Sequence, residues 1–351
     1  MEKKKKVENN PYLVTVSLNP ENQETPVHFV EEWITPEDLM YKRNHFPYPS
    51  RTEVSTTLHI NGLVDRPLAL DYKHLLSLPA KTLVVPLECA GNKRTFYSPR
   101  VYGVQWQKGA ISQGRWKGVP LSDLLKMAGV KPTVKEIVFE AVDRGADGTI
   151  YARSLPVEKA LHPDTIVAYE LNGRPLPFKH GYPLRLIVPG WYAMASVKWL
   201  SKITAIDHSF KGPFQTEDYM YYPYSDTDIG KTPVTTMKVN SIIQQPQDYD
   251  QLKKGMNKIK GLAWTGEGHI VRVDVSTDNG VSWNPATLQN DTQHPYAWTF
   301  WEFAWKAEQE GEFTILSRAT DSHGHTQPMQ PVWNRKGYGY NGIFKIRVKI
   351  E

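Results

Sequence analysis

The only cysteine of the chain, Cys89, lies in the segment 86–94, where an apolar run leads into a turn that carries Lys93 and Arg94. Nearby cations lower the pKa of a thiol and favour the thiolate, which is the form that binds soft metals or attacks electrophiles. A small buried side chain without chemistry is the alternative interpretation of Cys89. One cysteine excludes an internal disulfide, a four-cysteine zinc site and an iron–sulfur cluster. A redox function therefore requires a different cofactor.

Other side chains that could bind anions or metals are grouped in short motifs along the chain. They are Arg43-Asn44-His45-Phe46-Pro47, Cys89-Ala90-Gly91-Asn92-Lys93-Arg94, His180-Gly181-Tyr182-Pro183-Leu184-Arg185, Val197-Lys198-Trp199-Leu200, Gln215 followed by Asp218-Tyr219, Asp274-Val275-Ser276, Ser317-Arg318-Ala319-Thr320-Asp321 and Trp333-Asn334. Taken singly, each histidine or arginine is explained by a surface or structural role. Their order over residues 34–351 resembles that of the sulfite oxidase family, and the order is more specific than any single motif.

The resemblance implies a molybdenum cofactor, molybdopterin, in which a pterin dithiolene holds the metal and ends in a phosphate. Cys89 would then give the metal its protein thiolate. The resemblance assigns the pterin and its phosphate to Asn44, His45, Asp143, His180, Arg185, Ser196 and Lys198. In this set Asp143 can accept hydrogen bonds from pterin N–H groups, while Arg185 and Lys198 can pair with the phosphate.

The resemblance also implies a substrate pocket in which cations hold a small oxyanion beside the metal. Arg43 and Arg94 would line it, because arginine binds oxyanions through two directed hydrogen bonds. Trp106 would form an apolar wall and Tyr219 would contribute a phenol. Lys336 stands where vertebrate members of the family have a third arginine. A lysine keeps the charge but loses the forked geometry, which puts the substrate in question.

The activity implied is oxygen-atom transfer to sulfite, or to a related sulfur oxyanion, which gives sulfate. The electrons would leave to an external acceptor such as a cytochrome c. An assimilatory-type nitrate reductase, which shares the cofactor, is the first alternative, although Asp218-Tyr219 resembles the sulfite branch more. A non-catalytic binding protein that kept the fold and lost the metal is an alternative of a different class. The metal content of the purified protein would distinguish such a binding protein from a sulfite oxidase or a nitrate reductase.

The elements that must position these residues are predicted to form two domains, 1–232 and 233–351, since 351 residues are too many for one ordinary domain. The first is predicted to be an α+β domain with a mixed sheet and an irregular N-terminal extension. Within it, residues 120–128 predict a helix that ends at Gly129, and Thr35 followed by Pro36 predicts the cap of a short helix.

Beyond residue 233 the pattern changes to a two-residue period. Val271, Val273 and Val275 alternate with polar residues, the turn 278–280 follows, and apolar and charged residues alternate over 344–350. This pattern predicts an all-β, immunoglobulin-like sandwich of about 120 residues. The resemblance implies that it forms a homodimer, and the aromatic run 298–305 is expected to supply apolar surface for this contact.

Charge and hydropathy narrow the range of partners. The net charge is +5, and the one dense basic run, residues 3–6, is predicted to be a solvated tail rather than a nucleic-acid arm. No apolar run approaches the roughly 20 residues of a membrane span, and the N-terminus lacks the apolar stretch of a signal peptide. These observations favour a cytoplasmic protein without nucleic-acid or membrane partners, or a periplasmic one if a leader was removed.

Overall fold

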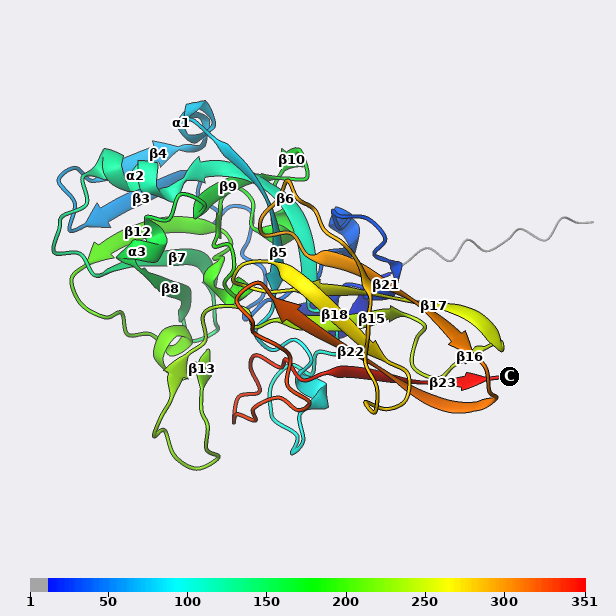
Figure 1. Cartoon of the computed structure of the whole chain (residues 1–351). Helices are drawn as coiled ribbons and strands as arrows, with labels where there is room; N and C mark the ends of the chain where they lie inside the picture. Colours follow the sequence, from blue (N-terminus) through cyan, green and yellow to red (C-terminus); the bar gives the residue numbers. More distant parts are fainter. Residues whose placement is uncertain (1–11) are drawn as a thin grey trace, which may run out of the picture.

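The computed structural model describes residues 12–351, and its strands form two β-rich parts that lie side by side (Figure 1). The first part, the body, contains the sheets built from residues 57–206 and the helices α1 to α3. The second part, the sandwich, contains the sheets built from residues 240–350. No helix within residues 12–351 is long and apolar enough to cross a membrane. The lysine run at residues 3–6 lies outside the described residues.

Two five-stranded sheets form the body. The first has the order β4-β3-β12-β7-β8 and consists of β4 (Leu68–Asp71), β3 (Thr57–Gly62), β12 (Leu200–Ile206), β7 (Glu136–Arg144) and β8 (Ile150–Pro156). The second consists of β10 (Arg174–Pro175), β9 (Ile166–Leu171), β6 (Ile111–Pro120) and β5 (Lys81–Glu88), with β11 (Arg185–Ile187) also paired to β9. Strands β12 and β3 are parallel and the other pairs are antiparallel. The predicted α+β class with a mixed sheet is therefore confirmed.

The helices are short, and they join the two sheets of the body. They are α1 (Tyr72–Ser77), α2 (Leu121–Ala128) and α3 (Val157–Ala160). The predicted helix at 120–128 is confirmed as α2, which ends at Gly129 in the left-handed conformation (φ 69°) and contacts both β3 and β6. The predicted cap at Thr35 is wrong. Only a 3₁₀ turn, η2 (Glu37–Leu39), follows, because the Thr35 hydroxyl accepts a hydrogen bond from the Gln113 amide instead.

Irregular segments carry much of the remaining chain of the first part. They contain the N-terminal hairpin β1 (Val14–Leu18) and β2 (Glu21–Glu24), the pair β13 (Met220–Tyr221) and β14 (Thr232–Pro233), the 3₁₀ turns η1 (Val27–Phe29), η3 (Arg94–Phe96), η4 (Phe178–His180) and η5 (Ala193–Ala195), and the π-helical turn η6 (Pro213–Glu217). Several of these turns lie next to predicted site residues, so turns as well as sheets position the site.

Two sheets form the sandwich and pack against each other through β15, β22 and β23. One has the order β15 (Asn240–Gln245), β17 (Gly255–Trp264), β21 (Thr299–Ala307), β20 (Thr287–Gln289). The other has the order β16 (Asp250–Leu252), β23 (Phe344–Ile350), β22 (Gly311–Asp321), β18 (Ile270–Ser276), β19 (Asn284–Pro285). The β-rich second part is confirmed, and this strand order favours the immunoglobulin-like interpretation.

Two details of the sandwich differ from the sequence pattern. Val271 is 47% exposed, because the register of β18 shifts between Ile270 and Arg272 and so breaks the predicted alternation. In the aromatic run 298–305, Trp298, Trp301 and Trp305 are buried within the chain, so only the partly buried Phe300 and Phe303 stay available for the predicted contact. These tryptophans belong to a core that is continuous with that of the body.

Candidate active site

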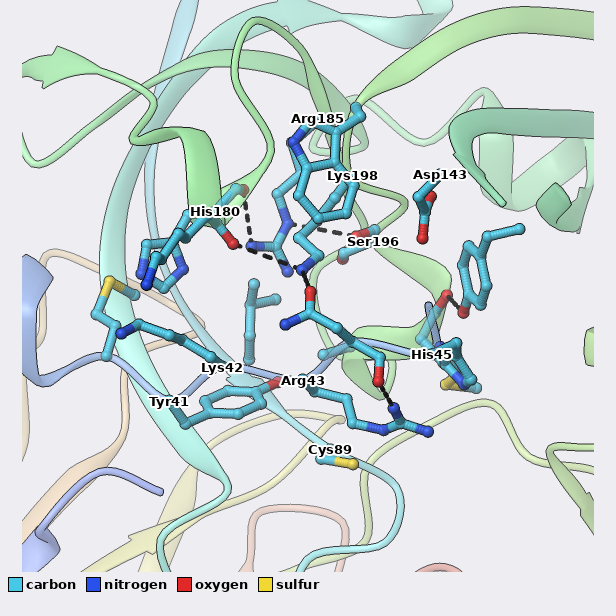
Figure 2. A pocket seen from close by; sticks show the side chains of 18 of the residues that line it. Tyr41, Lys42, Arg43, His45, Cys89, Asp143, His180, Arg185, Ser196 and Lys198 are labelled. Atoms are coloured by element: carbon cyan, nitrogen blue, oxygen red, sulfur yellow. Dashed lines mark hydrogen bonds between the residues drawn. The ribbon is translucent and has the colours of Figure 1, made fainter. Parts of the chain in front are cut away.

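One open pocket of about 750 Å³ gathers most of the predicted site residues (Figure 2). Of the thirteen predicted residues, ten line it: Arg43, Asn44, His45, Cys89, Asp143, His180, Arg185, Ser196, Lys198 and Tyr219. They come from segments that are far apart in the sequence. Figure 2 shows Arg185, Ser196 and Lys198 together at the end of the pocket away from Cys89, with Arg43 between.

Cys89 lies directly after β5, at the start of a tight turn. Its amide donates to the Ala110 carbonyl oxygen (2.9 Å), and its own carbonyl accepts from the Asn92 amide (2.8 Å). Gly91 in this turn has no room for a side chain, because a Cβ there would lie 2.7 Å from the guanidinium of Arg94. The glycine at position 91 therefore allows the guanidinium of Arg94 to lie close to the backbone of the turn that begins at Cys89.

The electrostatic surroundings of Cys89 differ from those predicted. The thiol is 6% exposed, and burial raises its pKa against the opposing effect of Arg43 and Arg94. Lys93 takes no part, because its backbone is left-handed (φ 64°) and its ammonium donates to the Ser241 carbonyl oxygen (3.0 Å) in the sandwich. The argument that Lys93 favours the thiolate is therefore wrong, and Arg43 takes its place.

Cationic and neutral donors fill the end of the pocket away from Cys89. Arg185 donates to the carbonyl oxygens of Ser196 (3.3 Å) and His180 (3.2 Å), and Lys198 donates to the Asn44 side-chain oxygen. Gly181 at the end of η4 has φ 112° and leaves space for Lys198, which a Cβ would approach within 3.1 Å. Arg185 and Lys198 keep further donors that can face a ligand.

Burial shifts the ionisation of several groups in this pocket. Desolvation, helped by Arg185 and Lys198, lowers the pKa of His180 to about 3, so its imidazole is neutral. Burial also raises the pKa of Asp143 and lowers that of Lys198, and each shift is opposed by attraction between the two groups. An anionic ligand would favour the charged form of Lys198.

Tyr219 and His45 form a hydrogen-bonded pair, with 2.6 Å between the Tyr219 hydroxyl and His45 Nε2. The His45 ring stacks on Tyr151 at 4.8 Å, and burial, then Arg43, lowers its pKa well below the usual value. A neutral imidazole in a fixed orientation can therefore direct the phenol. Tyr219 itself has φ 56°, a left-handed conformation that is uncommon for residues other than glycine.

Three predicted substrate residues lie outside the lining of this pocket. Arg94 donates to the backbone carbonyl oxygens of Lys336 (3.1 Å) and Val104 (3.0 Å). Trp106 is fully buried, and within residues 12–351 its indole nitrogen has no hydrogen-bond partner. The Lys336 ammonium forms an ion pair with Asp218 (2.8 Å). Their role toward a substrate stays a prediction.

Sequence reasoning missed two cations of the lining, Lys42 and Lys179. Each directly precedes a motif, Lys42 before Arg43 and Lys179 before His180, and this adjacency was the available signal. With them the lining holds five cations, Lys42, Arg43, Lys179, Arg185 and Lys198, against one carboxylate, Asp143. A thiol at one end and this excess of positive charge suit a ligand with a soft metal and an anionic group. The residues present thus fit molybdopterin.

Comparison with known proteins agrees with this donor set. The model of the oxidoreductase molybdopterin binding domain matches residues 45–214, and that of the Mo-co oxidoreductase dimerisation domain matches residues 231–351. The sulfite oxidase of Arabidopsis thaliana is 34% identical over 93% of this chain and 91% of its own length. The mitochondrial sulfite oxidase of Rattus norvegicus is also 34% identical, over 97% of this chain, which spans 66% of that protein.

A solved structure is similar over nearly the whole chain. It is the sulfane dehydrogenase SoxCD from Paracoccus pantotrophus, with a TM-score of 0.84 and 31% identity, and the match covers 98% of this chain and 92% of that one. Both parts of the fold, the body and the sandwich, are therefore shared with a relative of known structure.

Proposed function

The chain belongs to the sulfite oxidase family of molybdopterin oxidoreductases, and from this membership we propose that it oxidises sulfite, or a related sulfur oxyanion, to sulfate. The observation that carries the proposal is the convergence of ten predicted residues on one pocket, with the only cysteine at one end and the cations at the other. A bound molybdenum centre supplies oxygen-atom transfer and takes up two electrons.

The residues of the pocket divide the work of holding the cofactor. Cys89 would give its thiolate to the metal, and Asp143 would accept hydrogen bonds from the pterin. Arg185 and Lys198 would pair with the phosphate, where Asn44, His180 and Ser196 add polar contacts. Cys89, Asp143, His180 and Arg185 are buried in the free protein, and contacts at buried groups are stronger than they are in bulk solvent.

The substrate would lie on the Cys89 side, where Arg43 can bind an oxyanion and Tyr219 can hydrogen-bond it. His45 holds the phenol of Tyr219 in place through the 2.6 Å contact. Arg94 would contribute charge close to Cys89, while Trp106 keeps that side dry.

Steady-state turnover with two substrates tests the assignment. The protein, loaded with cofactor, should reduce ferricyanide or cytochrome c when sulfite is added. Arg94→Gln should raise the KM for sulfite about 10- to 150-fold, because a charge-assisted contact contributes roughly 1.5 to 3 kcal/mol. Arg100→Gln in the neighbouring exposed loop is the matched control and should leave KM unchanged. Nitrate reduction with a viologen donor and no sulfite-dependent turnover would replace this function by the nitrate reductase alternative.

The partners belong to the same proposal. An external one-electron acceptor such as a cytochrome c would receive the electrons, and the sandwich, from residue 233 onward, would mediate a homodimer. The match of residues 231–351 to a dimerisation domain supports the second point. Sedimentation equilibrium at micromolar concentration should give the dimer mass, and a monomer mass would contradict it.

A further inference from the structure

The N-terminal hairpin β1–β2 contacts two lysines of the pocket lining through the carboxylate of Glu21, whose side chain is 14% exposed. Glu21 Oε1 pairs with the Lys42 ammonium (3.1 Å), and Glu21 Oε2 pairs with that of Lys179 (2.8 Å). Both lysines line the pocket, whereas Glu21 does not. Burial alone would raise the pKa of Glu21, but the hydrogen bonds from Lys179 and Lys42 bring it down to about 2. The carboxylate is therefore ionised and joins two cations from different segments.

The hairpin is attached to the pocket wall by backbone contacts as well. Gln23 and Lys42 exchange two backbone hydrogen bonds (2.9 and 2.8 Å), and the Asn44 amide donates to the Asn22 side-chain oxygen (2.9 Å). The Asn44 side chain also donates to the Glu21 carbonyl oxygen (2.6 Å) while it accepts from Lys198. A chain of polar contacts thus runs from the hairpin to a predicted phosphate-binding residue.

The two lysines retain donors that can face the pocket. An ammonium has three donors. Lys42 uses two of them, on Glu21 and on the Gln23 side chain (2.9 Å), and Lys179 uses one on Glu21. Counted over residues 12–351, this leaves one donor on Lys42 and two on Lys179. Five cations around one carboxylate also leave an excess of positive charge that Glu21 compensates only in part.

We propose that Lys42 and Lys179, oriented by Glu21, bind the outer anionic end of the cofactor and that the β1–β2 hairpin thereby closes the pocket over it. The inference rests on the proposed function, because the anion in question is the phosphate of the pterin. Lys42 and Lys179 act as binding residues. Glu21 acts as a positioning residue, since it touches the lysines and not the ligand.

Cofactor retention by the loaded protein tests this proposal. Lys179→Met should speed the loss of molybdenum and pterin after dilution by about tenfold, since it removes one charge-assisted contact to the phosphate. Glu21→Gln should speed this loss as well, since it removes the carboxylate that orients both lysines. The matched controls are Lys202→Met and Glu140→Gln, which break a similar exposed pair (3.0 Å) on the surface of the body. Both controls should lose cofactor at the rate of the unaltered protein.

Two outcomes would overturn the proposal. The first is an unchanged rate of cofactor loss in Lys179→Met. The second is slower loss in Glu21→Gln, which would show that Glu21 competes with the phosphate instead of orienting its ligands.

Titration of the cofactor-free protein with inorganic phosphate separates this inference from the proposed function. Lys179→Met should weaken phosphate binding about tenfold, and Lys202→Met should leave it unchanged. If the unaltered protein holds no pterin at all, the proposed function fails, and this titration alone decides whether the anion site exists. Equal phosphate affinity in the two variants would then refute the site.

Discussion

The body and the sandwich hold polar side chains in different ways. In the sandwich the period of the strand decides burial: along β23 the residues Phe344, Ile346, Val348 and Ile350 are buried, and the three cations between them are exposed. In the first part, Asn44, His180 and Ser196 are buried although they lie in turns or irregular segments that follow no period. Burial of apolar side chains thus decides which residues of the sandwich face its core, whereas hydrogen bonds to backbone groups hold the polar side chains of the pocket in place.

The body and the sandwich also meet in a buried polar contact between side chains of both parts. Glu88, at the end of β5, accepts from the Trp264 indole (2.9 Å) and from the Asn92 side chain (3.0 Å). Lys93 is fully buried and donates to Asn240 and to the Ser241 carbonyl oxygen in β15. Both residues flank Cys89, so the turn that would bind the metal is fixed against the sandwich.

The largest expected effect concerns the body alone. Cys89→Ser should abolish sulfite-dependent turnover, by more than about 1,000-fold, because a serine hydroxyl does not replace the thiolate at the metal. The variant should still bind the cofactor, because the dithiolene holds the metal and Arg185 and Lys198 would still pair with the phosphate. The fold should persist, since the Cys89 amide keeps its bond to Ala110. Steady-state turnover and circular dichroism measure the lost activity and the retained fold. A protein without molybdenum before any substitution, taken from a host that makes the cofactor, would refute the assignment of Cys89.

Lys93→Met tests how much the contact between the two parts stabilises the protein. It removes the donor of two buried hydrogen bonds, to Asn240 and to the Ser241 carbonyl oxygen, which costs about 1 to 3 kcal/mol of unfolding free energy. Because the apolar cores are continuous, the unaltered protein should unfold in one transition, and the variant should do so at a lower temperature. Calorimetry measures this difference in temperature. Lys202→Met on the body surface is the control, and equal transition temperatures in the two variants would show that the Lys93 contact does not stabilise the protein.

The difference between the two parts also explains what the sequence could predict. The two-residue period of the strands predicts the sandwich, and Pro120 and Gly129 predict the two ends of a helix. Both predictions are confirmed, because each depends only on residues that are close in the sequence. The residues of the pocket were predicted from the order of motifs along the chain. Local patterns such as strand period or helix caps do not predict which of these motifs meet in space. Lys93 shows the limit of sequence reasoning. It follows Cys89 by four residues, which predicts a cation beside the thiol, but its left-handed backbone directs the side chain into the sandwich. Lys42 and Lys179 were missed because Glu21, the residue that pairs them, is distant in sequence.

The buried histidines of the pocket should make the stability of the protein depend on pH. His180 has a folded pKa of about 3 against its ordinary 6.5, so its contribution to stability is complete above pH 6.5 and is lost as the pH falls toward 3. At pH 5.5 the cofactor-free body should have lost about 1.4 kcal/mol of unfolding free energy through this group. The shift of His45 has the same sign.

Urea unfolding at pH 7.5 and 5.5 measures this loss. His180→Asn should remove about 1.4 kcal/mol of the difference between the two pH values, because asparagine does not titrate. His208→Asn, in an exposed loop, is the control and should show the full difference. An undiminished pH dependence in His180→Asn would mean that His180 is not the buried neutral group described here.

The smallest expected effect lies where a loop of the second part meets the body, at Lys336. Its ammonium pairs with Asp218 at 2.8 Å, and both side chains are more than a third exposed, so the pair contributes little. Lys336→Arg keeps the charge, and the arginine can bind the same carboxylate through two hydrogen bonds. The bond from Arg94 is unaffected, because it goes to the backbone carbonyl oxygen of Lys336. We therefore expect the KM for sulfite to change less than about threefold. A tenfold lower KM would show that residue 336 reaches the substrate and that Asp218 does not hold it away.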